Sequence, residues 1–170
     1  MLSLEELYHH YRESTQRYLY RLCGSMEQAE ELTQETFIKA GLGLLSFRGD
    51  CSVATWLFRI ARNTYLNSLR TPSPSRIETN EFLAIPDRCQ ERDPVEYYDV
   101  REQRSLIDQA VAQLPEKQRS ILLLRDEEGL SYAEIADVLG LSLSAVKVNL
   151  FRARHAFRNA YQTLGGGDEW

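Results

Sequence analysis

The stretch "LSYAEIADVLGLSLSAVKVNLFRARHAFR", residues 130–158, has the pattern of two short helices separated by a tight turn. Ser131 and Glu134 have the spacing of a capping box, so a helix is predicted to begin directly after Ser131. Gly140 permits the turn, and Ser142 is placed to cap the next helix. Two capped helices around a glycine-containing turn are typical of a helix-turn-helix.

The second helix of this pair, predicted over 143–163, has two different faces. At about 100° per residue, four apolar positions fall in one stripe that we expect to be buried: Val146, Leu150, Ala153 and Phe157. The opposite face combines cations, small residues and one aromatic: Ser144, Lys147, Val148, Phe151, Arg152, His155 and Arg158. Such a face suits a DNA groove, because Lys and Arg bind phosphates or guanine and apolar groups contact thymine methyls.

The composition limits the possible classes of protein. The chain has 170 residues, a net charge of −5, 43% hydrophobic residues and 26% charged residues, which is typical of a folded chain. No apolar run reaches the roughly 18–20 residues that span a bilayer, and the N-terminus lacks the features of a secretory signal. We therefore expect a cytoplasmic protein without membrane insertion.

The cysteines and histidines do not predict a metal site. Cys23, Cys51 and Cys89 are odd in number and widely spaced, without a Cys-x-x-Cys pair, which argues against a disulfide framework and a zinc cluster. The three histidines offer no metal-binding pair with a nearby Glu. We expect no metal and no cofactor.

The remaining chain predicts further helices and no strand. Apolar residues at 3–4 spacing predict a helix over 4–22, which Gly24 ends, and Ser25 with Gln28 opens a second helix through about Ala40. A third helix follows Ser52 and ends before Pro72. Helical pattern resumes over 95–113, and Pro115 opens another helix at its first turn.

The fold class is therefore all-α, with two small helical modules over 1–70 and 95–164 and a tail over 165–170. Between the modules, 71–94 holds four of the five prolines among polar residues, as a flexible linker does. About 24 residues reach at most ~80 Å, enough to place the modules two DNA turns, ~70 Å, apart.

The N-terminal module separates its charges. The run from Glu27 to Glu35 contains four acids and no base, so it should face a basic partner or water. The third helix instead interleaves basic and amide side chains with Trp56 and Tyr65, which suits nucleic acid: Arg59, Arg62, Asn63 and Asn67. The loop before it pairs Phe47 with a Gly-Asp turn, and an aromatic beside polar groups can hold an unstacked base.

Three collinear motifs resemble bacterial sigma factors of the extracytoplasmic-function (ECF) group of the sigma-70 family. "QAEELTQETFIKA" (28–40) resembles the region 2 helix that docks on the RNA polymerase clamp. "FRGDCSVATWLFRIARNTYLNSLR" (47–70) resembles the loop and helix that open and read the −10 element. "LPEKQRSILLLRDEEGLSYAEIADVLGLSLSAVKVNLFRAR" (114–154) is similar to region 4, which reads the −35 element.

The resemblance implies a region 2 bundle of three to four helices, a region 4 helix-turn-helix, and no enzymatic activity. The implied partners are core RNA polymerase (clamp and flap), promoter DNA and an anti-sigma factor. The implied polymerase-binding set is Glu31, Leu32, Gln34, Glu35, Phe37 and Lys39. The implied −10 set is Phe47, Arg48, Asp50, Arg59 and Asn63, and the implied −35 set is Arg125, Ser144, Lys147, Val148, Phe151 and Arg152.

The chain departs from the family pattern at a few positions. Gly41 replaces the usual aromatic and Gly43 follows it, so we expect the second helix to end early or to bend. Val53 and Ala54 replace bulkier residues after the loop, which affects the −10 preference, and Asn149 replaces an Arg, which removes one phosphate contact. Trp56 falls on the apolar stripe and is expected to pack in the core.

Two other functions remain open from the sequence. A stand-alone helix-turn-helix regulator with a sensing N-terminal module would explain the C-terminal helix, but not the acidic run or the second basic helix. A hydrolase using the carboxylates of Glu27–Glu35 with a divalent metal would lack any His, Asp or Gly-rich phosphate loop to complete its site.

Overall fold

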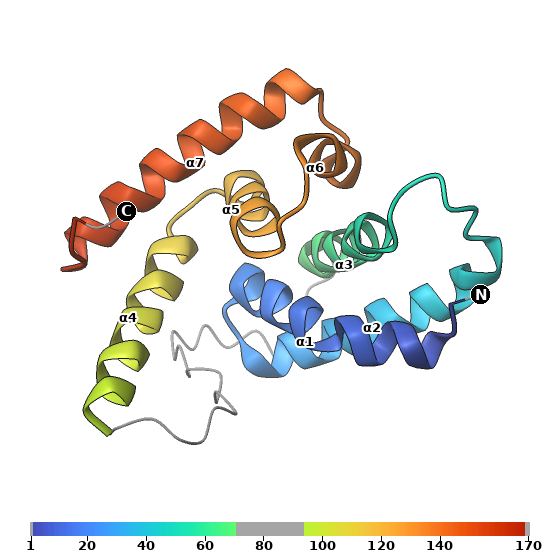
Figure 1. The fold of residues 1–170 in the computed structure, drawn as a ribbon, viewed down its shortest axis with the longest axis horizontal. Coiled ribbons are helices and arrows are strands. Elements are labelled where there is room, and N and C mark those ends of the chain that lie inside the picture. The colour runs from blue at the N-terminus through green and yellow to red at the C-terminus, as the bar shows by residue number, and fades with distance from the viewer. Residues whose placement is uncertain (1, 71–93, 169–170) are drawn as a thin grey trace.

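The computed structural model describes residues 2–70 and 94–168, and within these residues it is all-α, as predicted. The predicted linker over 71–94 lies, apart from Pro94, outside the described residues. In chain order the elements are α1 (Leu4–Cys23), α2 (Met26–Gly43), η1 (Leu44–Ser46), α3 (Val53–Arg70), α4 (Pro94–Ala112), α5 (Glu116–Leu122), η2 (Leu123–Glu127), α6 (Tyr132–Leu139) and α7 (Leu143–Thr163). Figure 1 shows α5 and α6 lying between α7 and the first three helices.

The helix ends follow from the capping residues that the sequence indicates. Gly24 ends α1 in the left-handed region at φ 74°, and Gly140 ends α6 there at φ 67°, where an L side chain is strained. Ser131 and Glu134 form the reciprocal capping box of α6, and Ser142 caps α7. The helix-turn-helix geometry predicted from residues 130–158 is therefore present.

Helix α2 is longer than expected. It continues through Gly41 to Gly43, and η1 follows directly, so of the two outcomes expected from the glycines, an early end near Ala40 is wrong, and a bend stays a prediction. The absence of a side chain at Gly41 has a packing consequence instead. A Cβ there would lie 3.0 Å from a terminal methyl of Leu4, so glycine lets the start of α1 approach α2 closely.

The segment after α5 contains an irregularity that the sequence did not predict. Residues Leu123–Glu127 form a π-helix, and the backbone N–H of Glu128 then donates to the carbonyl of Leu123. Wide turns of this kind insert an extra residue into a helix and turn the side chains that follow. This segment places Glu127 and Glu128 toward α1, where they meet arginines (distances below).

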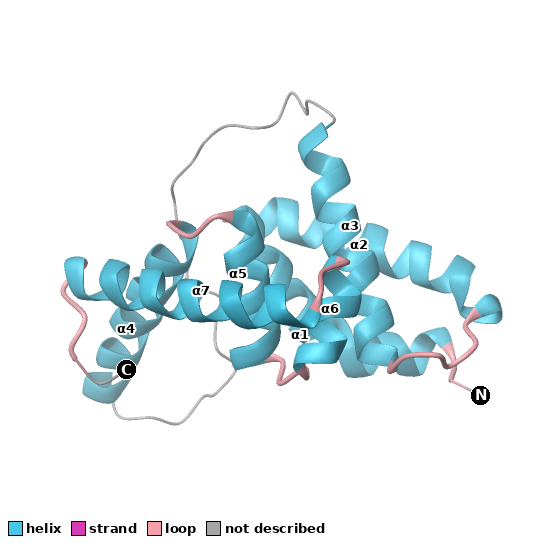
Figure 2. Cartoon of the chain, turned by 90° about the horizontal axis from the view of Figure 1, so that it is seen from above, coloured by secondary structure: helices cyan, strands magenta, loops and turns pink. Residues whose placement is uncertain are grey.

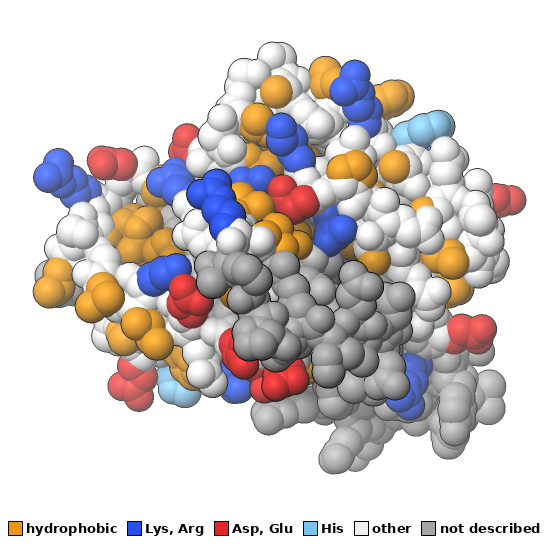
Figure 3. Space-filling view, turned by 180° about the vertical axis from the view of Figure 1, so that it is seen from behind, with side chains coloured by type: hydrophobic (Ala, Val, Ile, Leu, Met, Phe, Trp, Pro, Cys, Tyr) orange, Lys and Arg blue, Asp and Glu red, His pale blue; other side chains and the backbone are white. Residues whose placement is uncertain are grey.

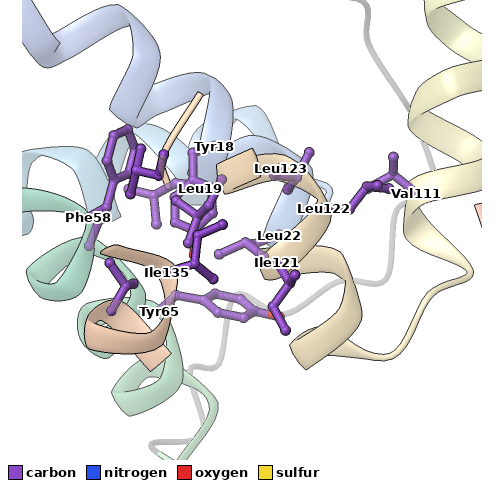
Figure 4. Packing of buried hydrophobic residues seen from close by; sticks show 14 of the residues in the cluster. Tyr18, Leu19, Leu22, Phe58, Tyr65, Val111, Ile121, Leu122, Leu123 and Ile135 are labelled. Carbon is purple, nitrogen blue, oxygen red and sulfur yellow. The ribbon is translucent and has the colours of Figure 1, made fainter. Parts of the chain in front are cut away.

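One hydrophobic cluster joins the two halves of the fold (Figure 4). Its fully buried members include Tyr18 and Phe58 from the first three helices and Ile121 and Ile135 from the later ones. The rings of Tyr18 and Phe58 pack edge to face with centroids 5.3 Å apart. Because the same cluster includes residues of α1, α3, α5 and α6, the first three helices and the helix-turn-helix pack against each other.

Smaller clusters complete the packing. Leu7, Phe37, Ala40 and Leu57 form one between α1, α2 and α3, with Trp56 packed against it. Ala110, Ala160 and Tyr161 form another between α4 and α7. Figure 2 shows helices and connecting loops and no strand in the described part of the chain. Within that part no helix is long and apolar enough to cross a bilayer.

Candidate nucleic-acid and polymerase interfaces

Helix α7 has the two faces that its sequence predicts. Val146, Leu150 and Ala153 are 0–2% exposed and belong to the main cluster, while Phe157 is partly buried against it. The opposite face is open to solvent, with Phe151 76% and Val148 47% exposed. Ser144, Lys147 and Arg152 from the predicted −35 set are exposed on the same face.

The position of α7 is fixed by polar contacts with the segment before it. The guanidinium of Arg154 donates two hydrogen bonds to the carboxylate of Asp126, at 2.6 and 3.2 Å, and this contact raises the pKa of Arg154. Since Asp126 lies in η2, the pair ties α7 to the preceding helical segment. Two parallel hydrogen bonds of this kind fix the guanidinium plane of Arg154 relative to the carboxylate plane of Asp126.

Arg125, in the predicted −35 set, is already engaged inside the fold. It donates to the backbone carbonyl of Leu130 at 2.9 Å, and its guanidinium lies over the Tyr132 ring at 4.9 Å from the centroid. These contacts hold the start of α6. Arg125 therefore helps to position the helix-turn-helix, and its role at the −35 element stays a prediction.

Asn149 differs from the family pattern in a way that the structure makes concrete. Its side-chain amide donates to the carbonyl of Ala145, one turn earlier on the same helix, at 2.8 Å. The amide of Asn149 thus binds the backbone of α7 itself, whereas the longer Arg of the family pattern would extend away from the helix.

The loop of the predicted −10 set lies between η1 and α3. Phe47 packs on Trp56 with centroids 4.9 Å apart, so the loop is attached to α3 through an aromatic pair. Arg48 and Asp50 are exposed on either side of Gly49, which has a φ of 76°. Trp56 is partly buried against the small cluster of α1, α2 and α3, as expected for a packing residue.

The basic side chains of α3 do not all face solvent. Asn63 is exposed, but the Nε of Arg59 donates to the backbone carbonyl of Asp137 in α6 at 3.3 Å. Arg62, which the sequence analysis left outside the −10 set, is 8% exposed and forms a two-pronged ion pair with Glu116 at 3.0 and 3.1 Å. Arg59 and Arg62 are thus bound by groups of the later helices.

The surface of α2 corrects part of the predicted polymerase-binding set. Glu31, Gln34 and Glu35 are exposed, and Lys39 pairs with Glu35 at 2.7 Å. Leu32 and Phe37 are 4% and 5% exposed. The expectation that they add an apolar contribution to the surface is wrong, because the opposite sides of α2 pack against α1 and α3.

Other apolar residues take that place on the surface. Ile38 is 65%, Leu42 81% and Leu45 93% exposed, and Ile38 and Leu42 follow Glu31 and Glu35 at helical spacing. That spacing was visible in the sequence, but it could not show which face of α2 the neighbouring helices cover. We name Glu31, Gln34, Glu35, Ile38, Leu42 and Leu45 the α2 surface.

On the face opposite to the view of Figure 1, the charges of the described residues do not form one basic surface. On the face shown in Figure 3, basic side chains lie close to acidic and apolar ones. The candidate sites are therefore separate areas on α2, α3 and α7.

Comparisons with known proteins identify the family of the chain. Residues 7–73 match the family model "Sigma-70 region 2", and residues 104–156 match "Sigma-70, region 4". The chain is 39% identical over 155 residues to RNA polymerase sigma factor YlaC of Bacillus subtilis, covering 89% of this chain and 88% of the relative. It is 38% identical over 141 residues to the ECF RNA polymerase sigma-E factor of Escherichia coli, covering 79% of this chain and 74% of the relative.

A solved structure has the same fold. It is the sigma factor RpoE of Bartonella quintana in complex with the anti-sigma factor NepR, with a TM-score of 0.76, 20% identity, and coverage of 93% of this chain and 96% of that one. The chain belongs to the extracytoplasmic-function group of the sigma-70 family of RNA polymerase sigma factors.

Sigma factors are transcription initiation factors that bind core RNA polymerase and promoter DNA, and they are not enzymes. The family thus decides against both the stand-alone regulator and the hydrolase. Below, "region 2" means α1–α3 and "region 4" means α4–α7.

Proposed function

We propose that this sigma factor docks on core polymerase through the α2 surface, engages the −10 element with α3 and the preceding loop, and reads the −35 element with α7. The main observation in support of the proposal is the exposed face of α7, which combines cations with Phe151, 76% exposed, on a helix-turn-helix that packs into the main cluster. Phe151 and Val148 lie three positions apart on α7, so their exposed side chains are neighbours beside the cations, and grouped apolar area is typical of interaction sites. Lys147 and Arg152 would contact phosphates or base edges, and Phe151 and Val148 thymine methyls.

The α2 surface has the chemistry to bind a basic, partly apolar helix of the polymerase clamp. Its carboxylates provide charge complementarity, and its three exposed apolar side chains provide area that water leaves on binding. Docking of α2 would also supply the affinity that the chain lacks for DNA alone. With a net charge of −5, the isolated chain gains little from phosphate neutralisation, and a partner that holds both regions makes the second DNA contact intramolecular.

The remaining assignments extend the same proposal. Region 2 extends over 1–70 and region 4 over 95–164, joined by the linker over 71–94. The protein acts in the cytoplasm and is held by an anti-sigma factor. The similarity to a sigma factor solved with its anti-sigma factor supports this last point at the level of the fold.

A core-polymerase pull-down beside in vitro transcription from fragments of the source genome tests the proposal. We expect Glu35→Lys and Leu42→Glu to lose core binding and transcription, because each places a repulsive or hydrated group on the α2 surface. Glu13→Lys is the matched control, since Glu13 is exposed on α1 outside that surface. Circular dichroism confirms folding. Full core binding by a folded Glu35→Lys protein would remove the α2 surface from the docking site.

A further inference from the structure

The contact between regions 2 and 4 adds opposite charges to the shared hydrophobic cluster. Among the described residues, the ion pairs that join the two regions take arginines from region 2 and carboxylates from region 4. In region 2 these residues are Arg17, Arg21, Arg59 and Arg62, and in region 4 they are Asp108, Glu116, Glu127, Glu128 and Asp137.

Near α1, the pairs connect helices that are far apart in the sequence. Arg17 contacts Glu128 at 3.2 Å, and Arg21 contacts Asp108 at 3.0 Å and also pairs with Glu127. The side chain of Glu128 is only 9% exposed. Burial raises the pKa of Asp108 and of Glu128, while the adjacent arginines oppose that rise.

On α3 the contacts with region 4 are made by Arg59, which belongs to the predicted −10 set, and by Arg62. Glu116 binds Arg62 through both oxygens and also accepts from Ser120, whose hydroxyl meets that of Tyr18 at 3.0 Å. Asp137 accepts from Arg59 through its backbone carbonyl, and its carboxylate lies 4.0 Å from the same guanidinium.

The loop next to α3 is bound by the helix-turn-helix as well. The hydroxyl of Ser52 caps α3 and donates to Glu134 at 2.9 Å. Glu134 is the capping-box residue of α6, and the backbone N–H of Ser131 lowers its pKa. The carboxylate of Glu134 thus accepts hydrogen bonds at the start of α6 and, while regions 2 and 4 are in contact, from Ser52 at the start of α3.

This arrangement cannot be the one that holds a promoter. The two promoter elements lie roughly two DNA turns, ~70 Å, apart, whereas α3 and α6 are in hydrogen-bond contact here. A guanidinium that forks onto a carboxylate has the same donors that a phosphate would use. Binding of the −10 strand therefore requires that region 4 first releases α3.

We infer that Glu116 and Asp137 of region 4 occupy the DNA-binding positions of Arg62 and Arg59, so that the closed chain is autoinhibited and Arg62 is a further −10 contact. The inference rests on the proposed role of α3. The acidic groups act as an internal substitute for DNA backbone. Core polymerase, by holding the regions apart, exposes both arginines at the moment when DNA can bind them.

The test opens the full-length chain at a point away from both proposed DNA surfaces. Glu128→Arg places a third cation beside Arg17 and Arg21 in a nearly buried site, and like charges there repel. Arg17→Glu with Glu128→Arg restores an opposite-charge pair. Glu13→Arg is the control, because it makes the same change in net charge at an exposed position of α1.

Two readouts are combined at one low salt concentration. Small-angle X-ray scattering gives the radius of gyration, and fluorescence anisotropy gives the affinity for a labelled single-stranded oligonucleotide of mixed sequence, without polymerase. We expect Glu128→Arg to expand the chain and to raise the affinity at least about fivefold above the Glu13→Arg control, since the apparent affinity scales with the competent fraction. The charge-swapped variant should return to wild type, and Arg62→Ala added to Glu128→Arg should reduce the gain.

Two results would overturn the inference. One is expansion without a gain in affinity, which would show that the arginines of α3 are not DNA contacts. The other is a Glu128→Arg protein, folded by circular dichroism, that stays as compact as wild type. Transcription by the wild-type chain with core polymerase tests the proposed function separately. It requires only that the polymerase-bound chain, with its regions held apart, works at a promoter, and it does not depend on how the free chain is closed.

Discussion

Leu150 and Phe151 are neighbours on α7 with opposite surroundings, and this pair allows packing to be separated from DNA binding. Leu150 is 2% exposed in the main cluster, whereas Phe151 is 76% exposed. Leu150→Ala leaves a cavity in a well-packed region, so we expect a loss of about 2–5 kcal/mol in the free energy of unfolding. Phe151→Ala removes few internal contacts, so the free energy of unfolding should change by no more than about 0.5 kcal/mol.

The effect of Phe151→Ala should instead appear in promoter binding. A phenylalanine side chain can bury about 150–250 Å². If DNA covers half of the exposed 76%, about 57–95 Å² at ~25 cal/mol per Å² contributes about 1.4–2.4 kcal/mol. That corresponds to roughly a 10–60-fold loss of affinity.

Urea denaturation followed by circular dichroism measures the first quantity for both variants. Single-round transcription at limiting holoenzyme, on a promoter first selected from genome fragments, measures the second. Arg12→Ala on α1 is a control for an exposed side chain outside α7. If Phe151→Ala transcribed like wild type, or destabilised the chain as much as Leu150→Ala does, then the assignment of this face to the −35 element would be wrong.

Two further predictions concern the turn and a thiol. Gly140→Ala should lower the free energy of unfolding by about 1–2 kcal/mol in urea denaturation, because φ is 67° and no atom lies within 4 Å of the added Cβ, so the cost comes from the backbone. Gly140→Asn should cost less, because Asn adopts the left-handed region more readily. Equal costs for the two variants would contradict a backbone origin. Burial raises the pKa of Cys23 to about 11, so at pH 8 about 0.1% is thiolate. Iodoacetamide should therefore alkylate Cys23 much more slowly in the native chain than in urea, as peptide mass spectrometry can measure; equal rates would refute this.

Most of the fold could be predicted from short sequence patterns. Capping residues such as Ser131 and Gly140 act within a few positions of themselves, so their consequences can be worked out without tertiary structure. The buried stripe of α7 was likewise predictable, because helical period and residue type agree there. Gly41 shows the limit: helix propensity predicted an early end or a bend, but α2 continues to Gly43 and Leu4 of α1 lies close to Gly41.

The candidate sites depended on information that local patterns do not contain. Periodicity showed that Leu32 and Phe37 lie on α2, but α2 is covered from two sides, so both are buried and Ile38 and Leu42 are exposed instead. Arg62 pairs with Glu116, 54 positions away in the chain. No spacing rule relates two such residues, so a basic residue expected to meet DNA could not be foreseen to meet a carboxylate of the same chain.

The internal pairing has a consequence for salt dependence that can be measured with the variants described above. Binding to single-stranded DNA releases counterions, and log K falls with log salt by about 0.7 for each phosphate neutralised. In the wild-type chain, Arg59 and Arg62 must first leave Asp137 and Glu116. The freed carboxylates then take up cations, which cancels part of the release. In the opened Glu128→Arg chain these carboxylates carry their counterions before DNA arrives.

We therefore expect the salt slope for the labelled oligonucleotide to be steeper for Glu128→Arg than for wild type, by about one unit for two arginines. The closed Glu13→Arg control, with the same net charge as the opened chain, should keep a slope near that of wild type. Fluorescence anisotropy across a series of salt concentrations measures all three slopes. Equal slopes for the three proteins would mean that no arginine is released from a carboxylate when DNA binds. The contact of Arg62 with Glu116 would then be a feature of the packing alone, and the autoinhibition would have to be abandoned, whatever the radius of gyration showed.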